Sequence, residues 1–292
     1  MSSSRSQAGV FGTIQSLRQR ICVARREGLA IGFVPTMGAL HEGHLSLVRA
    51  SQAECGLTVV SIYVNPTQFG PKEDYRRYPR DLEKDRDLLS RCGQPSPVVF
   101  FPADEEMYPS GFSTWVEVGE VSEPWEGCFR PGHFRGVATV VLKLLNIVLP
   151  DNAYFGQKDY QQAAVIRRLV RDLNVPVTIR VQPTVREPDG LAMSSRNAYL
   201  SPLERQQAMV LWKGLCLARD LAEQGERDPS RIMAKMREII LSVPEARIDY
   251  IAMADPDTLA PVSEIRGQTL AAVAVHVGGT RLIDNCLIGF GT

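Results

Sequence analysis

Two of the four histidines in this 292-residue chain stand three positions apart, in the stretch PTMGALHEGH at residues 35–44. A zinc-protease helix needs its histidines at i and i+4, and a Walker-type phosphate loop needs a Gly-Lys-Ser/Thr ending, so the stretch predicts neither site. Gly43 offers a position without a side chain where a flat base can lie against the backbone, and a helix start supplies N–H groups that favour anions. We therefore expect His41, Gly43 and His44 to bind a nucleoside triphosphate. The alternative is that both histidines only cap a helix or face solvent.

Three further polar motifs could serve the same chemistry. NPTQFG at residues 65–70 follows an apolar run, GQKDYQQ at 156–162 lies at a predicted strand-to-helix junction, and MSSRN at 193–197 lies on a predicted loop. Lys158 supplies a point charge suited to phosphate, and Asp159 is either an anionic hydrogen-bond acceptor or a helix cap. The hydroxyls and the guanidinium of MSSRN could close over phosphates, although serine-rich loops are common.

Strands and helices must place these motifs together. Apolar runs at residues 29–34 and 57–64 are typical of strands buried on both faces, and the segment between them predicts a helix that ends near Glu54. Continued alternation indicates a doubly wound, parallel-sheet, Rossmann-like α/β domain, whose ligands bind beyond the carboxyl ends of the strands. PTMGALHEGH and NPTQFG each follow a predicted strand, so both should face that crevice. The other strands are predicted at 97–101, 153–155 and 177–185, and the other helices at 14–27, 134–149 and 160–173.

The pattern changes after Arg186, where helices are followed by consecutive strands, as in a small α+β domain. Ser201 and Glu204 predict a capping box, with Pro202 at the first helical position. We expect a Rossmann-like domain over residues 1–183 and a smaller α+β lid domain over 184–292. Its later elements are predicted as a helix to about 225, a helix at 229–241, strands at 247–254 and 270–277, and a possible partner strand at 281–288.

The composition is that of a globular protein with no excess of either charge. Lys plus Arg and Asp plus Glu both number 33, which disfavours a nucleic-acid partner but not a local basic patch. The six cysteines are scattered without CxxC pairs, which suits reduced, buried thiols rather than a disulfide framework or a zinc site. The serine-rich start, MSSSRSQAG, lacks the apolar core of a signal peptide, and no run of about 18 apolar residues occurs. We expect a cytoplasmic protein with no membrane partner.

Taken in this order, the motifs resemble those of the pantothenate synthetase (pantoate–β-alanine ligase) family. This family belongs to the nucleotidyltransferase group that carries the HIGH signature and includes class I aminoacyl-tRNA synthetases. HEGH stands in the place of HIGH, and MSSR stands in the place of the KMSKS loop. The resemblance rests on PTMGALHEGHLSLV, SIYVNPTQFGPKEDYRRYPR, RPGHFRGVATVVLKLLNIV, FGQKDYQQ, MSSRNAYLS and DPDTL, and it runs over nearly the whole chain after residue 10.

The resemblance implies an ATP-dependent ligase that acts in two steps. The carboxylate of (R)-pantoate attacks the α-phosphorus of ATP, which gives pantoyl adenylate and pyrophosphate, and the amine of β-alanine then displaces AMP to form pantothenate. His44, as the proton donor to the developing charge, His41, Lys158 and Arg196 are the expected catalytic residues. The expected ATP site comprises Met37, Gly38, Ala39, Leu40, His41, Glu42, Gly43, His44, Gly156, Gln157, Lys158, Asp159, Val185, Met193, Ser194, Ser195 and Arg196.

The resemblance also implies the other partners. Gln68 and Gln162 are expected to bind pantoate, Gln68 also to bind β-alanine, and Asn65 to lie nearby. Mg²⁺ is expected with ATP, and Asp85 is a candidate ligand, although its charged segment DLEKDRDLL favours a solvated face. A homodimer formed through the N-terminal domain is expected.

Two segments have open interpretations. Arg130 and His133 could approach the adenylate or only shape a turn. Residues 70–80, charged and bounded by prolines, have the composition of a mobile flap that could shelter the adenylate from water.

Three other classes of protein share part of this pattern. An aminoacyl-tRNA synthetase should carry a basic nucleic-acid surface, which the balanced charge argues against. Another HIGH-type nucleotidyltransferase or adenylate-forming enzyme is the second alternative, and a simple nucleotidyltransferase would stop at an adenylated product and show no amine-dependent release of AMP. A nucleotide-binding protein without activity would need neither Gln68 nor Gln162.

Overall fold

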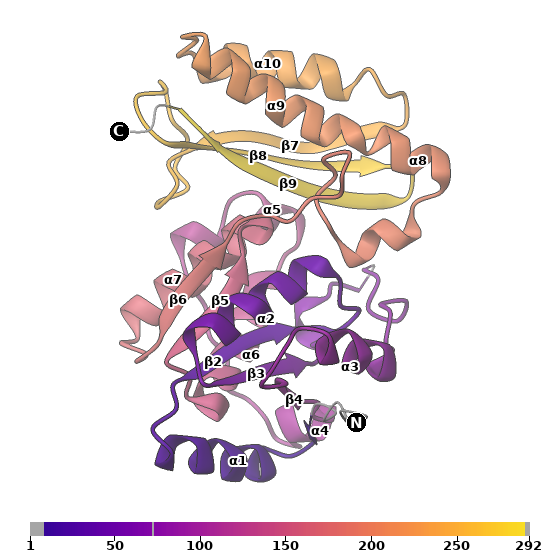
Figure 1. Ribbon diagram of the computed structural model, residues 1–292. Coiled ribbons are helices and arrows are strands. Elements are labelled where there is room, and N and C mark those ends of the chain that lie inside the picture. Colours follow the sequence, from indigo (N-terminus) through magenta and orange to yellow (C-terminus); the bar gives the residue numbers. More distant parts are fainter. Residues whose placement is uncertain (1–8, 72, 290–292) are drawn as a thin grey trace. The chain divides into compact units, whose positions relative to one another are not determined.

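The computed structural model describes residues 9–71 and 73–289 (Figure 1), so the serine-rich start lies outside the described residues except for Gly9. The chain divides into two compact units. Unit 1 comprises residues 1–122, 126–156 and 162–183, and unit 2 comprises residues 123–125, 157–161 and 184–292. The units are therefore not two continuous stretches, because two short segments that precede residue 184 cluster with residues 184–292.

Unit 1 is built on a parallel sheet with the strand order β1-β4-β3-β2-β5-β6. Proceeding from β2, the chain adds β3 and β4 on one side and then β5 and β6 on the other, so the order reverses between β2 and β5. In a doubly wound sheet this reversal marks where ligands bind, beyond the carboxyl ends of the strands. The strands are β1 (Val10–Phe11), β2 (Ile31–Thr36), β3 (Leu57–Ile62), β4 (Val98–Phe100), β5 (Asn152–Gly156) and β6 (Thr178–Gln182).

Helices cover the strands of unit 1 because their apolar residues recur at helical spacing. Leu45 and Val48 pack with Val34 and Val60 of the sheet, and Leu89 joins the same cluster. The α-helices are α1 (Ile14–Arg26), α2 (Glu42–Glu54), α3 (Leu82–Ser90), α4 (Asp104–Met107), α5 (Glu126–Phe129), α6 (His133–Val148) and α7 (Tyr160–Asp172). The short 3₁₀ turns are η1 (Pro66–Gln68), η2 (Glu120–Ser122) and η3 (Gln157–Asp159), of which η3 belongs to unit 2.

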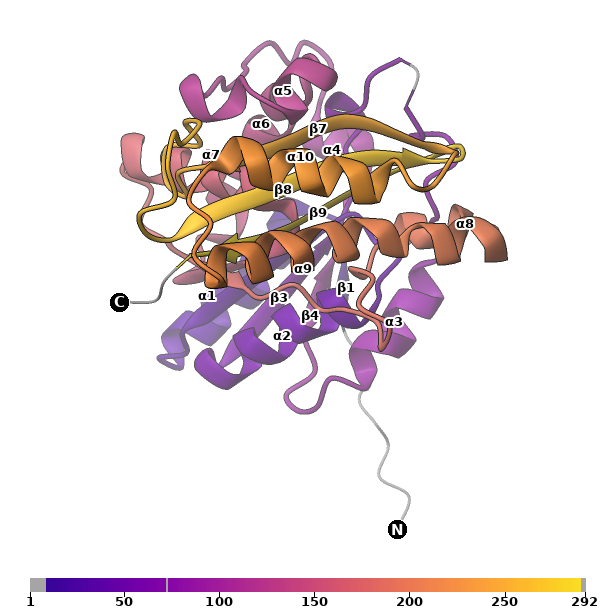
Figure 2. The same ribbon diagram turned by 90° about the horizontal axis from the view of Figure 1, so that it is seen from above.

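Unit 2 is an antiparallel sheet of three strands with helices on one face. In Figure 2, α9 and α10 lie side by side over the sheet β7-β8-β9, and their apolar faces form one core with it. The expected capping box of Ser201 and Glu204 is present, with Pro202 at the helix start. The elements are η4 (Ser195–Tyr199), α8 (Pro202–Gln207), α9 (Met209–Glu223), α10 (Pro229–Ile240), β7 (Ala246–Ala254), β8 (Thr269–Val277) and β9 (Thr280–Ile288).

The structure confirms the predicted fold class, a doubly wound α/β unit and a smaller α+β unit, but it moves several ends. Pro35 lies inside β2, although the apolar run was expected to end there. Proline has no N–H to donate, but β2 pairs with β5 only at Gly32 and Phe33. Pro35 therefore lies where β5 no longer needs a hydrogen-bond donor from β2. β6 ends at Gln182, before Pro183, and not at the expected Val185. MSSRN is not a simple loop, because η4 begins at Ser195.

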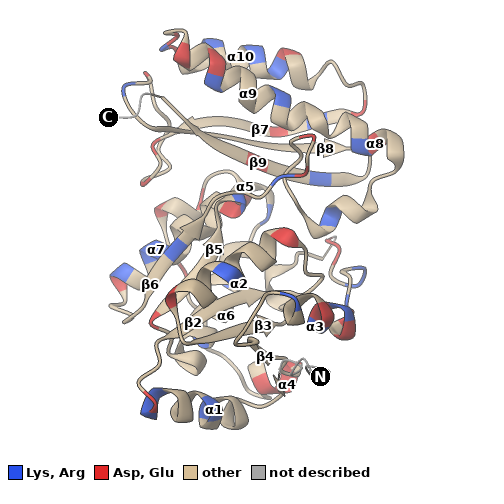
Figure 3. Cartoon of the chain, in the orientation of Figure 1, with Lys and Arg blue, Asp and Glu red and all other residues tan. Residues whose placement is uncertain are grey.

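The structure shows where the charged residues and the cysteines lie. Basic and acidic residues are interspersed over both units (Figure 3). Cys55 and Cys92 are buried as expected, but the prediction of buried thiols is wrong for Cys22 and Cys128, which are exposed. Among the residues that the structure describes, none of the helices combines the length and the apolar character needed to cross a membrane.

Candidate active site

The turn that follows β2 joins the two predicted histidines. His41 is the N-cap of α2, and its Nδ1 accepts a hydrogen bond from the N–H of Gly43 at 3.2 Å. The Nδ1 of His44 accepts from the N–H of His41 at 3.3 Å, which completes a capping box made of two imidazoles whose ring centroids lie 4.1 Å apart. The capping role, which was the alternative for these residues, is therefore real.

Capping also fixes where each imidazole carries its proton. A ring nitrogen that accepts from an N–H bears no hydrogen, so this arrangement assigns the neutral rings of His41 and His44 a proton on Nε2. Each ring then combines an acceptor that holds the helix start with an N–H donor on its other nitrogen. Capping and donation to a phosphate oxygen are compatible in one imidazole.

Asp85 of α3 holds the backbone of the same turn. Its carboxylate accepts from the N–H of Ala39 at 3.0 Å and from the N–H of Leu40 at 2.8 Å. The expectation that Asp85 lies on a solvated face is wrong, because only 2% of it is exposed. Burial raises the pKa of Asp85, and the two N–H groups oppose this increase. Ala39 has a left-handed φ of 50°, which is costly for a residue with a Cβ, so Asp85 holds the turn in a strained conformation.

Gln68 contacts this turn from η1. Its side chain is 8% exposed, its Nε2 donates to the Sδ of Met37 at 3.1 Å, and its Oε1 accepts from Nδ2 of Asn65 at 3.1 Å. The structure therefore brings together Met37 of the predicted ATP site and Gln68 of the predicted pantoate site. Asn65, a predicted neighbour, is 1% exposed and also donates to the carbonyl of Gly136.

Arg130 and His133 lie behind Gln68 in a buried polar network. His133 Nδ1 lies 2.9 Å from the carbonyl oxygen of Gln68, and its Nε2 lies 3.1 Å from a guanidinium nitrogen of Arg130. Arg130 in turn binds both carboxylate oxygens of Glu73 at 2.7 Å. Burial, reinforced by the charge of Arg130, lowers the pKa of His133 to about 4. His133 is thus neutral near pH 7, accepts from Arg130 and donates to the Gln68 backbone.

The same network bears on the proposed flap. Glu73 belongs to residues 70–80, and its paired guanidinium ties the segment to Arg130, near the start of α6. Burial raises the pKa of Glu73, but the hydrogen bond and charge of Arg130 prevail and lower it overall. Tyr78 is buried, with its ring 6.1 Å from that of Phe69. Glu73 and Tyr78 are thus both held against other residues of unit 1.

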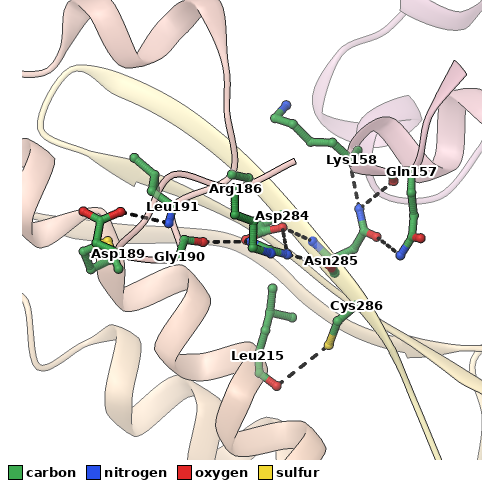
Figure 4. Close-up of polar contacts among 12 residues, drawn as sticks. Gln157, Lys158, Arg186, Asp189, Gly190, Leu191, Leu215, Asp284, Asn285 and Cys286 are labelled. Atoms are coloured by element: carbon green, nitrogen blue, oxygen red, sulfur yellow. Dashed lines mark hydrogen bonds and ion pairs between the residues drawn. The ribbon is translucent and has the colours of Figure 1, made fainter. Parts of the chain in front are cut away.

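In unit 2, the segment that follows β5 is held by a residue that the sequence motifs did not identify. Asn285 of β9 donates from Nδ2 to the carbonyl oxygens of Gln157 at 3.0 Å and Lys158 at 2.8 Å (Figure 4). The Lys158 side chain extends away from Asn285, and its amine lies 3.7 Å from the carboxylate of Asp159. Asp159 therefore pairs with the lysine that was expected to neutralise phosphate.

Arg186 fixes the next predicted ATP segment to the neighbouring residue of β9. Its guanidinium forms two hydrogen bonds with the carboxylate of Asp284, at 2.7 and 3.0 Å, and stacks 3.6 Å from the centroid of the Trp212 ring (Figure 4). The side chain of Asp284 is 3% exposed, and burial raises its pKa although Arg186 opposes the increase. The chain then turns back at Gly190, which has a φ of 99° and lies so close to Trp212 that a Cβ would be 2.2 Å from the ring.

This turn carries the remaining predicted residues. Arg186 bridges to Ala192, and the N–H of Met193 donates to the carbonyl of Val185 at 3.0 Å, so Val185 and Met193 lie on paired arms. Ser194 caps η4 by accepting from the N–H of Arg196 at 3.3 Å. The hydroxyl oxygen of Ser194 therefore already accepts a hydrogen bond from the backbone of Arg196.

The other predicted site residues lie in different surroundings. Gly156 ends β5, and Glu42 pairs with Arg49 on the exposed side of α2. Gln162 is half-buried in α7. Sequence reasoning missed the roles of Asp284, Asn285 and Arg186, which no local motif marks. The signal in the sequence was the adjacent pair Asp284 and Asn285 between apolar residues of RLIDNCLI.

No protein cage for a metal ion occurs in residues 9–71 and 73–289, where no three His, Cys, Asp or Glu side chains are suitably grouped. The candidate ligand Asp85 has both carboxylate oxygens engaged by backbone N–H groups.

Comparison with known proteins finds relatives over nearly the whole chain. The family model for pantoate-beta-alanine ligase matches residues 9–287. A pantothenate synthetase of Moorella thermoacetica is 56% identical over 276 residues, covering 94% of this chain and 97% of the relative. One from Thermotoga neapolitana is 54% identical over 280 residues, covering 96% of this chain and 99% of the relative.

Solved structures agree with this. The pantothenate synthetase of Thermus thermophilus superposes with a TM-score of 0.90 at 49% identity, covering 95% of this chain and 98% of that one. A pantoate-beta-alanine ligase of Francisella tularensis, complexed with beta-gamma ATP and beta-alanine, gives a TM-score of 0.77 at 34% identity, covering 96% and 97%.

Proposed function

The chain belongs to the pantoate–beta-alanine ligase family, and from this premise we propose that it condenses (R)-pantoate with β-alanine to pantothenate at the expense of ATP. The observation that carries the proposal is the family match over residues 9–287, which spans the HEGH turn, Gln68, Lys158 and the MSSR segment together. The position of the HEGH turn after β2, where the strand order reverses, supports a nucleotide site there.

The reaction requires two displacements. A carboxylate oxygen of pantoate forms a bond to the α-phosphorus of ATP while the bond to pyrophosphate breaks. The amine of β-alanine then attacks the acyl carbon of pantoyl adenylate, AMP leaves with the acyl C–O bond electrons, and the amine loses a proton to give the amide. Activation is needed because a free carboxylate is a poor acyl donor, and the enzyme contributes mainly orientation and stabilisation of charge.

The geometry of the HEGH turn supports the ATP-binding role proposed for it. Residues 37–44 present the N-terminus of α2, and His41 and His44 each carry an Nε2 proton that can be donated to a phosphate oxygen. A neutral N–H donor suffices for this stabilisation, and His44 is the proposed donor to the charge that develops on the leaving pyrophosphate. Gly43 is proposed to lie beneath the adenine or ribose.

The two cationic side chains proposed to bind phosphate belong to unit 2. Lys158 and Arg196 neutralise phosphate oxygens as charge moves onto pyrophosphate, and Ser194 and Ser195 donate hydrogen bonds. Gly156, Gln157, Asp159, Val185 and Met193 complete the proposed nucleotide-binding residues.

Two glutamines are proposed to bind the acid. Gln68 and Gln162 hold the hydroxyls and the carboxylate of pantoate, and Gln68 also meets β-alanine. The contact of Gln68 with Met37 supports this assignment, because the amide proposed to bind pantoate then lies against the turn proposed to bind ATP.

The remaining features of the proposal concern the assembly. Mg²⁺ enters as the counter-ion of ATP and is held by phosphate oxygens. Residues 1–183 act as the substrate-binding domain and residues 184–292 as a smaller lid domain. The enzyme is proposed to work as a homodimer in the cytoplasm, without a nucleic-acid or membrane partner.

The decisive experiment is the exchange of labelled pyrophosphate into ATP, measured with pantoate, without pantoate, and then after addition of β-alanine. Exchange that requires pantoate but not β-alanine, followed by release of AMP and pantothenate when β-alanine is added, is the expected result. ADP as the product would indicate an acyl phosphate instead and would overturn the adenylate mechanism. Absence of exchange by folded protein that binds ATP would overturn the ligase assignment.

A further inference from the structure

Asp284 and Asn285 are adjacent polar residues in the middle of β9, and their side chains leave opposite faces of the sheet. Asp284 pairs in register with Val273, which belongs to the core beneath α9 and α10, whereas Asn285 pairs with Ala272. Both side chains are almost fully buried, and residues 284 and 285 are each 3% exposed. A buried amide and a buried carboxylate in an apolar strand are costly unless their hydrogen bonds are made, so their partners are informative.

The partners of Asn285 lie in η3. Its amide donates to two consecutive carbonyls, those of Gln157 and Lys158, and its Oδ1 lies 3.5 Å from Nε2 of Gln157 (Figure 4). These bonds fix the backbone from which the Lys158 side chain departs. They also account for the clustering of residues 157–161 with unit 2.

The partner of Asp284 is Arg186. The guanidinium that binds this carboxylate also donates to the carbonyl of Gly190 at 3.0 Å and to the carbonyl of Asn285 at 3.3 Å. The ion pair thereby fixes the arms that carry Val185 and Met193, the latter leading directly into Ser194, Ser195 and Arg196. Two adjacent residues of one strand thus hold the two segments of unit 2 that the proposed mechanism places on the phosphates.

We propose that Asp284 and Asn285 are positioning residues for adenylation, with Asn285 acting through Lys158 and Asp284 through the Val185–Met193 turn. This inference rests on the proposed function. Neither residue needs to touch the substrate. Each instead sets the backbone from which a cationic side chain reaches a phosphate, and misplacement of such a group by about 1 Å can cost a hundredfold in rate.

Asn285→Ala is the sharper test, since Asp284 variants leave Arg186 without its buried partner and can fail to fold. We expect the single-turnover rate of pantoyl adenylate formation to fall by about ten- to a hundredfold, while the Kd of ATP changes by less than about threefold. In a Lys158→Ala background the same substitution should have almost no further effect, because the group that Asn285 positions is already absent.

Asp249→Asn is the matched control. Asp249 lies on β7 of the same sheet, its side chain is 4% exposed, and it pairs with Arg247, Arg281 and His276 rather than with a proposed nucleotide segment. It should lower Tm at least as much as Asn285→Ala and leave the adenylation rate within about twofold.

Each outcome decides a separate question. If wild-type protein shows pantoate-dependent exchange but Asn285→Ala matches it in rate, the positioning role is refuted while the proposed function stands. An equal loss in the presence and absence of Lys158 would also refute it, because Asn285 would then act elsewhere. If the wild-type protein shows no exchange, the proposed function and this inference fall together.

Discussion

At the scale of single residues, His44 serves two purposes with the two nitrogens of one ring. Nδ1 caps α2, and Nε2 carries the proton that is proposed to reach the phosphates. The two roles can be separated, because the side-chain oxygen of asparagine can replace the Nδ1 acceptor, whereas the amide of glutamine reaches the position of Nε2.

We expect His44→Asn to retain most of the stability but to lose adenylation by about 10²- to 10³-fold, as when one preorganised donor is removed. His44→Gln should retain more of the rate, and because glutamine at the third helical position can also reach back to the N–H of His41, its unfolding free energy should change by less than about 1 kcal/mol. Urea unfolding and pantoate-dependent exchange on both variants test this. The opposite ranking of rates would contradict the Nε2 assignment.

Lys158 should act on the reaction rather than on binding, since charge on the leaving pyrophosphate grows only in the transition state. Lys158→Ala is therefore expected to lower the adenylation rate by about 10²-fold or more, with a smaller change in the Kd of ATP. Rapid-quench kinetics and calorimetry measure the two quantities separately. A loss of ATP affinity with an unchanged adenylation rate at saturating ATP would show instead that Lys158 binds the ground state and the transition state equally well.

Local sequence suggested which residue types could form this site but not how deeply each side chain is buried. The side chains of HEGH and GQKDYQQ suit phosphate binding, but their spacing left helix capping open, and the family resemblance supplied their expected roles. Asp85 misled the same reasoning because DLEKDRDLL is charged on most sides, and only the fold shows that one carboxylate turns inward to the N–H groups of Ala39 and Leu40. Asn285 could not be predicted, because its partners lie 127 and 128 positions away in the chain.

At the scale of elements, α3 shapes the turn after β2 through Asp85. We expect Asp85→Asn to lower the unfolding free energy by about 1–3 kcal/mol, because an amide oxygen can accept one N–H but its NH₂ group faces the other. The affinity for ATP should fall as well, since Ala39 loses the contact that holds its left-handed backbone.

Asp81→Asn provides the control for that change. Asp81 is the exposed N-cap of the same helix, it accepts from the N–H of Lys84 at 3.0 Å, and asparagine caps helices about equally well. It removes the same charge from the same element. If denaturant unfolding and ATP titration give equal effects for the two variants, the loss at Asp85 is one of charge and not of turn geometry.

The type and order of the elements could be predicted, whereas their ends depended on neighbours. Continuous apolar runs gave the central strands, and the capping box at Ser201 gave a helix start. β1 was missed because Val10–Phe11 forms a strand only by pairing with Val99 and Phe100 of β4, which a two-residue segment cannot signal. The 3₁₀ turn η4 was missed for a similar reason, since MSSRN has the composition of a loop.

At the scale of the whole molecule, stability should depend on pH through His133. Its pKa is about 4 in the folded protein, against 6.5 for an ordinary histidine, so the unfolded chain binds more protons between these values. The stabilisation is complete above pH 6.5 and is lost as the pH falls through 4. At pH 5 the loss from this one group is about 2 kcal/mol.

His133→Asn isolates this contribution, because asparagine does not titrate. Denaturant unfolding at pH 7, 6 and 5 should give a steeper loss of stability for wild-type protein than for the variant, although the variant starts lower. Parallel curves would show that His133 is not the buried neutral group that its contacts with Arg130 and Gln68 imply.

Because Gln157–Gln161 belongs to unit 2 although it lies between two segments of unit 1, the chain is a poor substrate for recombination at a single crossover. A hybrid that takes residues 1–183 from this chain and the rest from a relative would combine the 157–161 segment of one parent with β9 of the other. Such a hybrid should fold well only where the 157–161 segment and the residues of β9 that contact it come from the same parent. Divergence within the family is therefore expected to couple these two distant stretches of sequence.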